Sequence, residues 1–256
     1  MPEIPGSIDL RERVVFITGG SRGIGAAAVR AIHRAGGTVF FTYRERGDAA
    51  RALAAELGER VYAAPLDVAR HDALPAAVEE CVRRFGRLDV LINNAAIFAE
   101  NAFDGDDYDA WQAGWERTFA VNVFGAANLA WLAMRHMRAQ GEGTIVNVAS
   151  RAAHRGELSF ADYGASKAAL VNLTKSIARS CAKDGVVAMA VAPGFVETDM
   201  ALHDLEERGD EIRAEIPLGI VATPEHVAHV IAFLCTPLAR QLNGATLDLN
   251  GGSYVR

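Results

Sequence analysis

Residues 18–25 read Thr18-Gly19-Gly20-Ser21-Arg22-Gly23-Ile24-Gly25, and this glycine-rich stretch decides how the chain folds. Before it, residues 13–17 form a short apolar run rich in β-branched side chains, which predicts a strand. After it, residues 26–35 are rich in alanine, which predicts a helix. Glycines in such a turn let the backbone approach a ligand, and the helix offers free N–H groups to an anion such as pyrophosphate. On this pattern alone, an ordinary strand-to-helix turn remains an alternative.

The same alternation of strand and helix continues along the chain. Strands are predicted at residues 38–43, 61–66, 88–93, 144–150, 186–191 and 245–249, and helices at 49–57, 72–85, 109–138, 161–182 and 224–234. This alternation predicts βαβ units and an α/β fold with a doubly wound parallel sheet of about seven strands. The strands are almost continuously apolar, so we expect helices on both faces of the sheet. The length of 256 residues fits a single domain over residues 1–256.

Composition narrows the classes of function. A net charge of −6 argues against a nucleic-acid-binding surface. Cys81, Cys181 and Cys235 form no C-x-x-C pair, which favours reduced thiols and a cytoplasmic protein. No apolar run reaches transmembrane length, so we expect no membrane partner. His226 and His229 are three residues apart, but no Cys or carboxylate set completes a metal site.

A tyrosine and a lysine four residues apart carry the first catalytic hypothesis. Tyr163 and Lys167 fall on the predicted helix 161–182, where positions i and i+4 share a face. A nearby ammonium group should lower the pKa of the phenol and prepare Tyr163 as a general acid and base. Taken alone, the pair could equally be an ordinary surface contact.

Further polar residues fall where predicted strands end. Asn94 follows strand 88–93, Ser150 ends strand 144–150, and Asp67 follows strand 61–66. Ligands of open α/β sheets bind outside the carboxyl ends of the strands, so these residues should meet the glycine turn at one crevice. Asn122 interrupts the apolar helix 109–138, where an unpaired amide would cost stability.

The ordered set of these motifs resembles the short-chain dehydrogenase/reductase family from Arg13 to Gly252. The set comprises the glycine turn, Asn93-Asn94-Ala95-Ala96, Asn122, Ser150, the Tyr163/Lys167 pair and Pro193-Gly194 with Thr198. The resemblance implies a Rossmann-type fold, a nicotinamide cofactor and either carbonyl reduction or alcohol oxidation. The pattern is nearest to the 3-oxoacyl-[acyl-carrier-protein] reductases.

The resemblance also implies a role for each matched position. Tyr163 would exchange a proton with the substrate oxygen, and Ser150 would hydrogen-bond that oxygen. Lys167 would bind the nicotinamide ribose, and Asn122 would position a water that links Lys167 to solvent. The positions implied to contact the cofactor are Gly19, Ser21, Arg22, Gly23, Ile24, Gly25, Tyr43, Arg44, Asp67, Val68, Asn94, Ala95, Ala96, Tyr163, Lys167, Pro193, Gly194, Val196 and Thr198.

The end of strand 38–43 bears on which nicotinamide is used. An NAD-binding protein of this fold usually places a carboxylate there, whereas this chain has Tyr43 followed by Arg44. With Arg22 in the glycine turn, the two guanidinium groups favour the additional phosphate of NADP(H), and NAD(H) remains the alternative. Arg44 could instead be a solvated charge at a strand end.

Two segments are expected to face the substrate. Residues 199–218 are polar and charged, which predicts a mobile lid, and the stretch before Tyr163 departs from the 3-oxoacyl reductase pattern. His154, Arg155 and Phe160 in that stretch could contact the substrate or face solvent. An acyl carrier protein is acidic and would need a basic patch, which Arg135, Arg138, Arg179 and Lys183 could form.

Three functions therefore remain in competition. The first is an NADP(H)-dependent ketone reductase, the second an NAD-dependent dehydrogenase of a sugar, sterol or other secondary alcohol, and the third a nonenzymatic cofactor-binding regulator. The third predicts that a catalytic residue is missing, and none is. The resemblance also implies a homotetramer, with helices 109–138 and 161–182 as the contact, although packing within one chain could explain their apolar surfaces.

Overall fold

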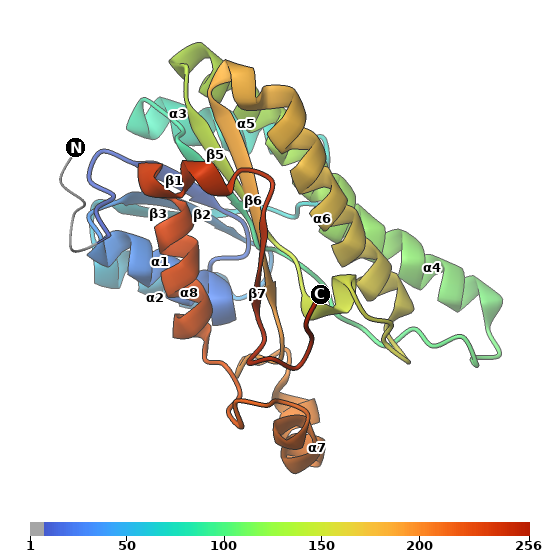
Figure 1. Cartoon of the computed structure of the whole chain (residues 1–256). Coiled ribbons are helices and arrows are strands. Elements are labelled where there is room, and N and C mark those ends of the chain that lie inside the picture. The colour runs from blue at the N-terminus through green and yellow to red at the C-terminus, as the bar shows by residue number, and fades with distance from the viewer. Residues whose placement is uncertain (1–7) are drawn as a thin grey trace.

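A sheet of parallel strands forms the centre of the computed structural model, which describes residues 8–256 (Figure 1). The strand order is β3-β2-β1-β4-β5-β6-β7, and every pairing is parallel. The strands are β1 (Val14–Ile17), β2 (Thr38–Tyr43), β3 (Val61–Pro65), β4 (Val90–Asn93), β5 (Gly143–Val148), β6 (Val186–Pro193) and β7 (Thr246–Leu249). The expected doubly wound parallel sheet is confirmed.

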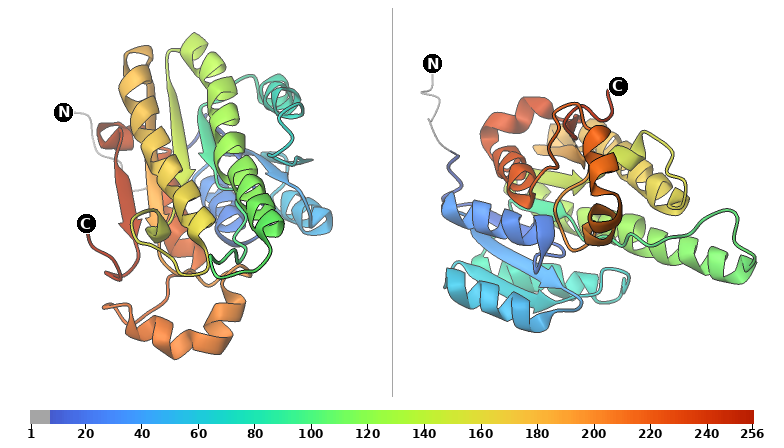
Figure 2. Two further views of the ribbon diagram at one scale, coloured as in Figure 1. Left: turned by 90° about the vertical axis from the view of Figure 1, so that its right-hand side faces the viewer. Right: turned by 90° about the horizontal axis from the view of Figure 1, so that it is seen from below.

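Helices cover both faces of this sheet (Figures 1 and 2). One face packs against α1 (Gly23–Arg34), α2 (Gly47–Leu57) and α8 (Pro224–Leu234), and the other against α3 (Leu74–Phe85), α5 (Ala126–Gln140) and α6 (Ala161–Cys181). The remaining helical segments are α4 (Tyr108–Phe119), α7 (Leu202–Ala214), the π-helix η1 (Ala120–Gly125) and the 3-10 helices η2 (Arg151–Ala153), η3 (Ala182–Asp184) and η4 (Pro237–Leu242).

The two-residue period of a strand explains the two hydrophobic cores. In β1, Val15 and Ile17 point toward the α1 and α8 side, whereas Val14 and Phe16 point toward the α3 and α5 side. Each of these side chains is at most 5% exposed. Because both faces of the strand are buried, the run has to be apolar throughout, as the sequence shows.

The long helix predicted at residues 109–138 is not one regular α-helix. The observed helical run consists of α4, η1 and α5, so its central turns have π geometry. A π-turn accommodates one extra residue without ending the helix, and such turns often accompany functional positions. Asn122 lies in this segment.

The carboxyl ends of the strands place the site. Because β1 lies between β2 and β4, the chain changes direction across the sheet at β1, where a crevice for a ligand opens. α7 lies beyond this edge, away from the layers that cover the sheet (Figures 1 and 2). α4 packs against α6 and projects past the sheet.

Candidate active site

The glycine turn between β1 and α1 requires its glycines for steric reasons. Gly19 and Gly23 have φ angles of +68° and +52°, which side chains disfavour. At Gly25 a Cβ atom would lie 2.1 Å from the carbonyl oxygen of Gly19. No side chain caps the N-terminus of α1, so its backbone N–H groups remain available to an anion.

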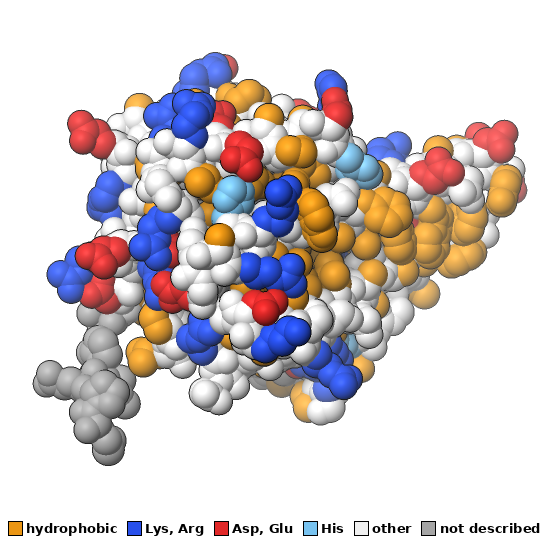
Figure 3. Space-filling model, turned by 90° about the horizontal axis from the view of Figure 1, so that it is seen from above, with side chains coloured by type: hydrophobic (Ala, Val, Ile, Leu, Met, Phe, Trp, Pro, Cys, Tyr) orange, Lys and Arg blue, Asp and Glu red, His pale blue; other side chains and the backbone are white. Residues whose placement is uncertain are grey.

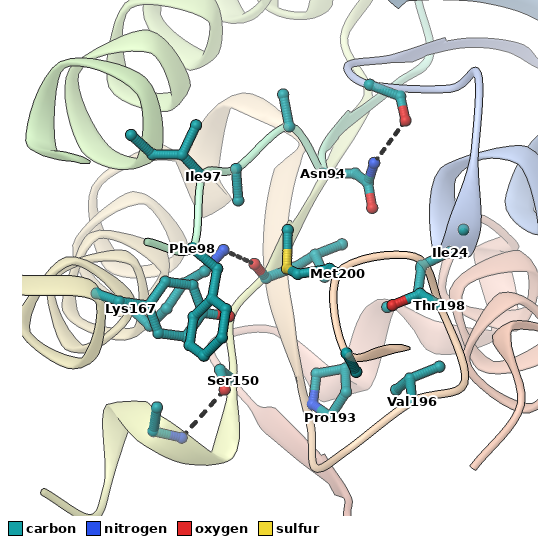
Figure 4. A pocket seen from close by; sticks show the side chains of 18 of the residues that line it. Ile24, Asn94, Ile97, Phe98, Ser150, Lys167, Pro193, Val196, Thr198 and Met200 are labelled. Carbon is teal, nitrogen blue, oxygen red and sulfur yellow. Dashed lines mark hydrogen bonds between the residues drawn. The ribbon is translucent and has the colours of Figure 1, made fainter. Parts of the chain in front are cut away.

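Hydrogen bonds fix this turn to the end of β4. The Thr18 hydroxyl accepts from the backbone N–H groups of Asn94 at 3.0 Å and Ala95 at 2.9 Å. The Asn94 amide in turn donates to the carbonyl oxygens of Thr18 at 2.9 Å and Gly19 at 3.0 Å, and Figure 4 shows its side chain pointing toward the turn. Asn94 therefore helps to shape the crevice as well as lining it.

A cavity of about 530 Å³ extends from the glycine turn along the strand ends. Every residue that the sequence assigned to the cofactor lines this cavity, as do Ser150, Tyr163 and Lys167. Asn122 does not line it. The sequence thus predicted which residues the fold brings together, while their contacts with a cofactor remain a prediction.

Ser150, Tyr163 and Lys167 come from two neighbouring elements. Ser150 follows β5 and accepts a hydrogen bond from the Ala152 N–H at 3.1 Å. Tyr163 and Lys167 lie on α6, and Lys167 Nζ is 5.5 Å from the centroid of the tyrosine ring. Lys167 Nζ also donates to the Val148 carbonyl oxygen at 2.8 Å, which holds the ammonium group at the end of β5 (Figure 4).

Burial controls the ionisation of this pair. Burial raises the pKa of Tyr163 to about 12, although a hydrogen bond with Ser150 acts in the opposite direction. Burial also lowers the pKa of Lys167 to about 7. The prediction that Lys167 lowers the tyrosine pKa is therefore wrong for the chain by itself, because desolvation penalises both charged forms.

The side chain of Asn122 connects elements around the cavity. Its amide donates to the Ile97 carbonyl oxygen at 3.1 Å and to Ser166 Oγ at 3.0 Å, and its oxygen accepts from the Ile97 N–H at 2.9 Å. The loop after β4 is thereby tied to α6 beside Lys167. Both amide hydrogens are used in these bonds, so the side chain has an evident positioning role, and the water relay remains a prediction.

The part of the cavity beside the end of β2 carries more charges than the sequence analysis named. Arg44 pairs with Glu45, whose pKa it holds below the usual range. Arg46 and Arg22 both approach the Asp199 carboxylate, at 3.4 and 3.8 Å. Glu45, Arg46 and Asp199 also line the cavity. No periodicity or motif pointed to the pairing of these residues, because it depends on how the loops meet.

Aromatic side chains lie beside Tyr163. The rings of Phe98 and Phe160 stack with centroids 3.9 Å apart, and Phe98 meets the ring of Tyr163 edge-on at 4.9 Å. Of the stretch expected to face the substrate, Arg155 and Phe160 line the cavity. His154 does not, because its ring stacks on Tyr254 instead. Sequence reasoning missed Phe98.

The segment expected as a lid, residues 199–218, contains α7. Met200, Arg208, Ile212 and Glu215 from this segment line the cavity, and Asp199 at its start lies beside Arg22 of the glycine turn. Its mobility remains a prediction. In residues 8–256, none of the helices combines the length and hydropathy needed to span a bilayer.

Comparisons with known proteins agree with this geometry. A family model described as enoyl-(acyl carrier protein) reductase matches residues 19–254. The chain is 34% identical to the 3-oxoacyl-[acyl-carrier-protein] reductase of Aquifex aeolicus, covering 96% of this chain and 99% of that protein. It is 37% identical to the cis-4-hydroxycyclohexanecarboxylate dehydrogenase of Sinomonas cyclohexanicum, with 94% and 96% covered.

Solved structures give the same result. A short-chain dehydrogenase/reductase from Brucella melitensis, described as a glucose/ribitol dehydrogenase, superposes with a TM-score of 0.90 at 32% identity, covering 98% of this chain and all of that one. A 3-ketoacyl-(acyl-carrier-protein) reductase from the same organism, complexed with NADH, superposes with a TM-score of 0.88 at 29% identity. The match covers 96% of this chain and 100% of that one.

Proposed function

The chain belongs to the short-chain dehydrogenase/reductase family of CH–OH/C=O oxidoreductases, and on this premise we propose that it reduces a ketone to a secondary alcohol with NADP(H). The observation that carries this proposal is the convergence of Ser150, Tyr163 and Lys167 on the cavity that begins at the glycine turn. Acid–base, hydrogen-bonding and anion-binding groups then lie within one crevice. A nonenzymatic regulator would not need this arrangement.

The residues of the crevice fit a nicotinamide dinucleotide. The glycine turn leaves backbone N–H groups and space for a pyrophosphate, and Lys167 lies at the opposite side of the cavity, where a ribose would be held. A bound nicotinamide supplies the hydride in reduction or accepts it in oxidation. Asp67 and Val68 line the cavity near β3, in agreement with a role beside the adenine.

Tyr163 supplies the proton in this mechanism. In reduction, its phenol donates a proton to the ketone oxygen as the carbonyl carbon gains a hydride, and the product is a neutral secondary alcohol. The Ser150 hydroxyl donates a hydrogen bond to the same oxygen and stabilises the negative charge that develops there. The raised pKa of Tyr163 keeps the phenol protonated before substrate binds, which suits a general acid.

Lys167 supports proton transfer from Tyr163 through its positive charge. A charged Lys167 stabilises the phenolate that remains after transfer, and its hydrogen bond to Val148 holds Nζ near the tyrosine. A positively charged oxidised nicotinamide would act in the same direction. In the chain alone burial raises the tyrosine pKa, and we expect this pKa to fall when the cofactor binds.

The preference for NADP(H) rests on charge at the end of β2. Tyr43 and Arg44 stand where a ribose-binding carboxylate is usual, and Arg46 adds a guanidinium group that lines the same part of the cavity. Glu45 opposes this preference, since it pairs with Arg44. The relative complexed with NADH supports the alternative, in which NAD(H) is used.

The relatives suggest two classes of substrate. Those named 3-oxoacyl-[acyl-carrier-protein] reductases support a 3-oxoacyl thioester, with an acyl carrier protein as the macromolecule that delivers it. The relative named cis-4-hydroxycyclohexanecarboxylate dehydrogenase supports the direction of the second function, oxidation of a secondary alcohol. Either direction uses the same proton exchange at Tyr163.

A homotetramer through α4, α5 and α6 is part of this proposal. Figure 3 shows hydrophobic side chains gathered along the projecting α4 end of the molecule. The rings of Tyr108, Trp111, Trp115 and Phe119 follow one another along α4, with neighbouring centroids 5.6 to 5.9 Å apart. Tyr108 is 70% exposed and the other three are partly exposed, and an apolar surface of this kind favours association. Sedimentation at micromolar concentration tests it, and a monomer would contradict it.

The function is tested by measuring NADPH consumption with a panel of ketones that includes acetoacetyl thioesters, and repeating it with NADH. Turnover of a ketone with NADPH supports the proposal. Turnover with NADH but not with NADPH would contradict the preference for NADP(H) and support the NAD-dependent alternative. Absence of turnover with every ketone and both cofactors would contradict it.

A further inference from the structure

Arg151 is a buried charge that the mechanism does not use. It directly follows Ser150, opens the 3-10 helix η2 and lines the cavity. Its side chain is only 4% exposed. A guanidinium group cannot shed its charge in a protein, so its burial is costly unless other groups satisfy its N–H donors.

The protein satisfies few of these donors. Nη1 donates to Ser253 Oγ at 2.8 Å, which is the one hydrogen bond that the Arg151 side chain makes within residues 8–256. Glu215 Oε2 lies 3.9 Å from Nη1, beyond hydrogen-bond distance. The Phe195 ring lies 5.1 Å from Cζ. Since an arginine offers five N–H donors, the remainder have no protein acceptor in the described chain and are available to a molecule in the cavity.

The neighbouring charges do not neutralise Arg151 closely. Glu215 is 45% exposed and is shared with Arg155, which lies 3.6 Å from it. Arg155 also pairs with Glu157 at 3.3 Å. Burial and the charge of Arg155 both lower the pKa of Arg151, so the guanidinium is in surroundings where a further anion would be stabilising. An exposed and shared carboxylate such as Glu215 is a weak partner.

We propose that Arg151 binds a carboxylate of the substrate, so that the ketone reduced by this enzyme is a keto acid. The inference rests on the proposed function, in which Ser150 holds the ketone oxygen. Ser150 and Arg151 line the same cavity, so one substrate that carries both a ketone and a carboxylate can contact both residues. Planar guanidinium and carboxylate groups pair through two parallel hydrogen bonds. Phe98, Phe160 and Phe195 line the same cavity and offer apolar surface to that carbon chain.

The test compares acetoacetate with its two neutral counterparts, methyl acetoacetate and the N-acetylcysteamine thioester of acetoacetate. The wild-type enzyme should have a kcat/KM for acetoacetate about tenfold or more above that for either neutral ketone, because a charged hydrogen-bonded pair forms only with the acid. Arg151→Gln should lower kcat/KM for the acid about 10- to 100-fold and change the value for the ester less than about threefold. Arg213→Gln, which removes an exposed charge outside the cavity, should leave the ratio unchanged.

Direct binding separates this proposal from the ketone reductase proposal. Titration calorimetry of wild type in the presence of NADPH should show benzoate binding more tightly than benzamide, with the difference lost in Arg151→Gln and partly kept in Arg151→Lys. This measurement on wild type holds even if Arg151→Gln fails to fold or if no ketone is turned over. A kcat/KM for the neutral ketones that equals or exceeds that for acetoacetate would overturn carboxylate recognition. Benzamide that binds as tightly as benzoate would also overturn it. Absence of all ketone turnover would instead overturn the proposed function.

Discussion

The two ends of the cavity are built in different ways. At the glycine turn, the backbone of residues 18–25 contributes to the surface, and glycines are required because side chains would collide. Around Ser150 and Tyr163, side chains from the loop after β5, the loop after β4 and the lid segment form the surface. A surface made of backbone can be predicted from a short sequence motif. A surface made of side chains cannot, because it depends on contacts between distant segments. The two ends should therefore respond differently to substitution.

The largest contrast is expected for Gly25→Ala. Its Cβ would lie 2.1 Å from the Gly19 carbonyl oxygen, so the turn must shift. The overpacking should cost about 1–3 kcal/mol, or roughly 5- to 150-fold in NADPH affinity. Fluorescence titration of NADPH measures this effect.

Gly105→Ala is the matched control for that substitution. The nearest atom to its added Cβ is 3.9 Å away, and it lies outside the cavity. Its NADPH affinity should equal that of wild type. Equal affinities of the Gly25 and Gly105 variants would remove the distinction between a backbone surface and a side-chain surface.

Asn122→Ala should show that the two ends share a support. The change leaves the Ile97 backbone groups and Ser166 without their amide partner, which should cost about 1–3 kcal/mol of stability. The melting temperature should fall, and kcat should fall with it because the α6 segment beside Lys167 loosens. Gln112→Ala, which loses one exposed hydrogen bond on α4, should have the same melting temperature as wild type. An unchanged melting temperature for Asn122→Ala would contradict the positioning role.

Substitutions beside β2 should alter the choice of cofactor without altering catalysis. Arg44→Ala should weaken NADPH relative to NADH by about tenfold, because a charge-assisted hydrogen bond to the phosphate is lost. Glu45→Ala should change the ratio in the opposite direction, since it releases Arg44. The ratio of kcat/KM for the two cofactors measures both effects. If Arg44→Ala leaves the ratio unchanged, Arg44 is a solvated charge.

The smallest effect concerns pH. Burial lowers the pKa of Lys167 to about 7, so the free enzyme loses this positive charge as pH rises through that value. Since charged Lys167 supports proton transfer from Tyr163, kcat/KM for reduction should decline above neutral pH. In Lys167→Arg the guanidinium stays charged, and the decline should disappear even if the overall rate is lower. A decline that persists in this variant would have to be assigned to another group.

The sequence predicted the backbone-determined features best. The strand at residues 38–43 and the helix at 224–234 coincide with β2 and α8, because apolar runs and breakers mark their limits. The π-turn around Asn122 was not predicted from periodicity, since one extra residue barely changes a helical pattern. The first turn of α1 was also not predicted. α1 begins at Gly23, three residues before the expected start, and the low helix propensity of Gly23 and Gly25 argued against a helix there.

The side-chain environment of the site could not be predicted in the same way. The direction of the Tyr163 pKa shift depends on how strongly burial opposes the effect of nearby charges. The spacing of Tyr163 and Lys167 in the sequence does not reveal this balance. The position of Arg151 in the cavity and that of His154 against Tyr254 depend on how η2 turns after β5. Arg46 pairs with Asp199 only because the lid segment begins beside the glycine turn.

The central claim is that Tyr163 supplies the proton in a cavity that binds the cofactor independently of it, and Tyr163→Phe tests it most directly. Turnover of the best ketone and the dissociation constant for NADPH would be measured on the same protein. We predict that kcat falls about 10²- to 10⁴-fold while NADPH affinity stays within about threefold of wild type. Turnover near the wild-type rate, with the cofactor bound normally, would contradict the account.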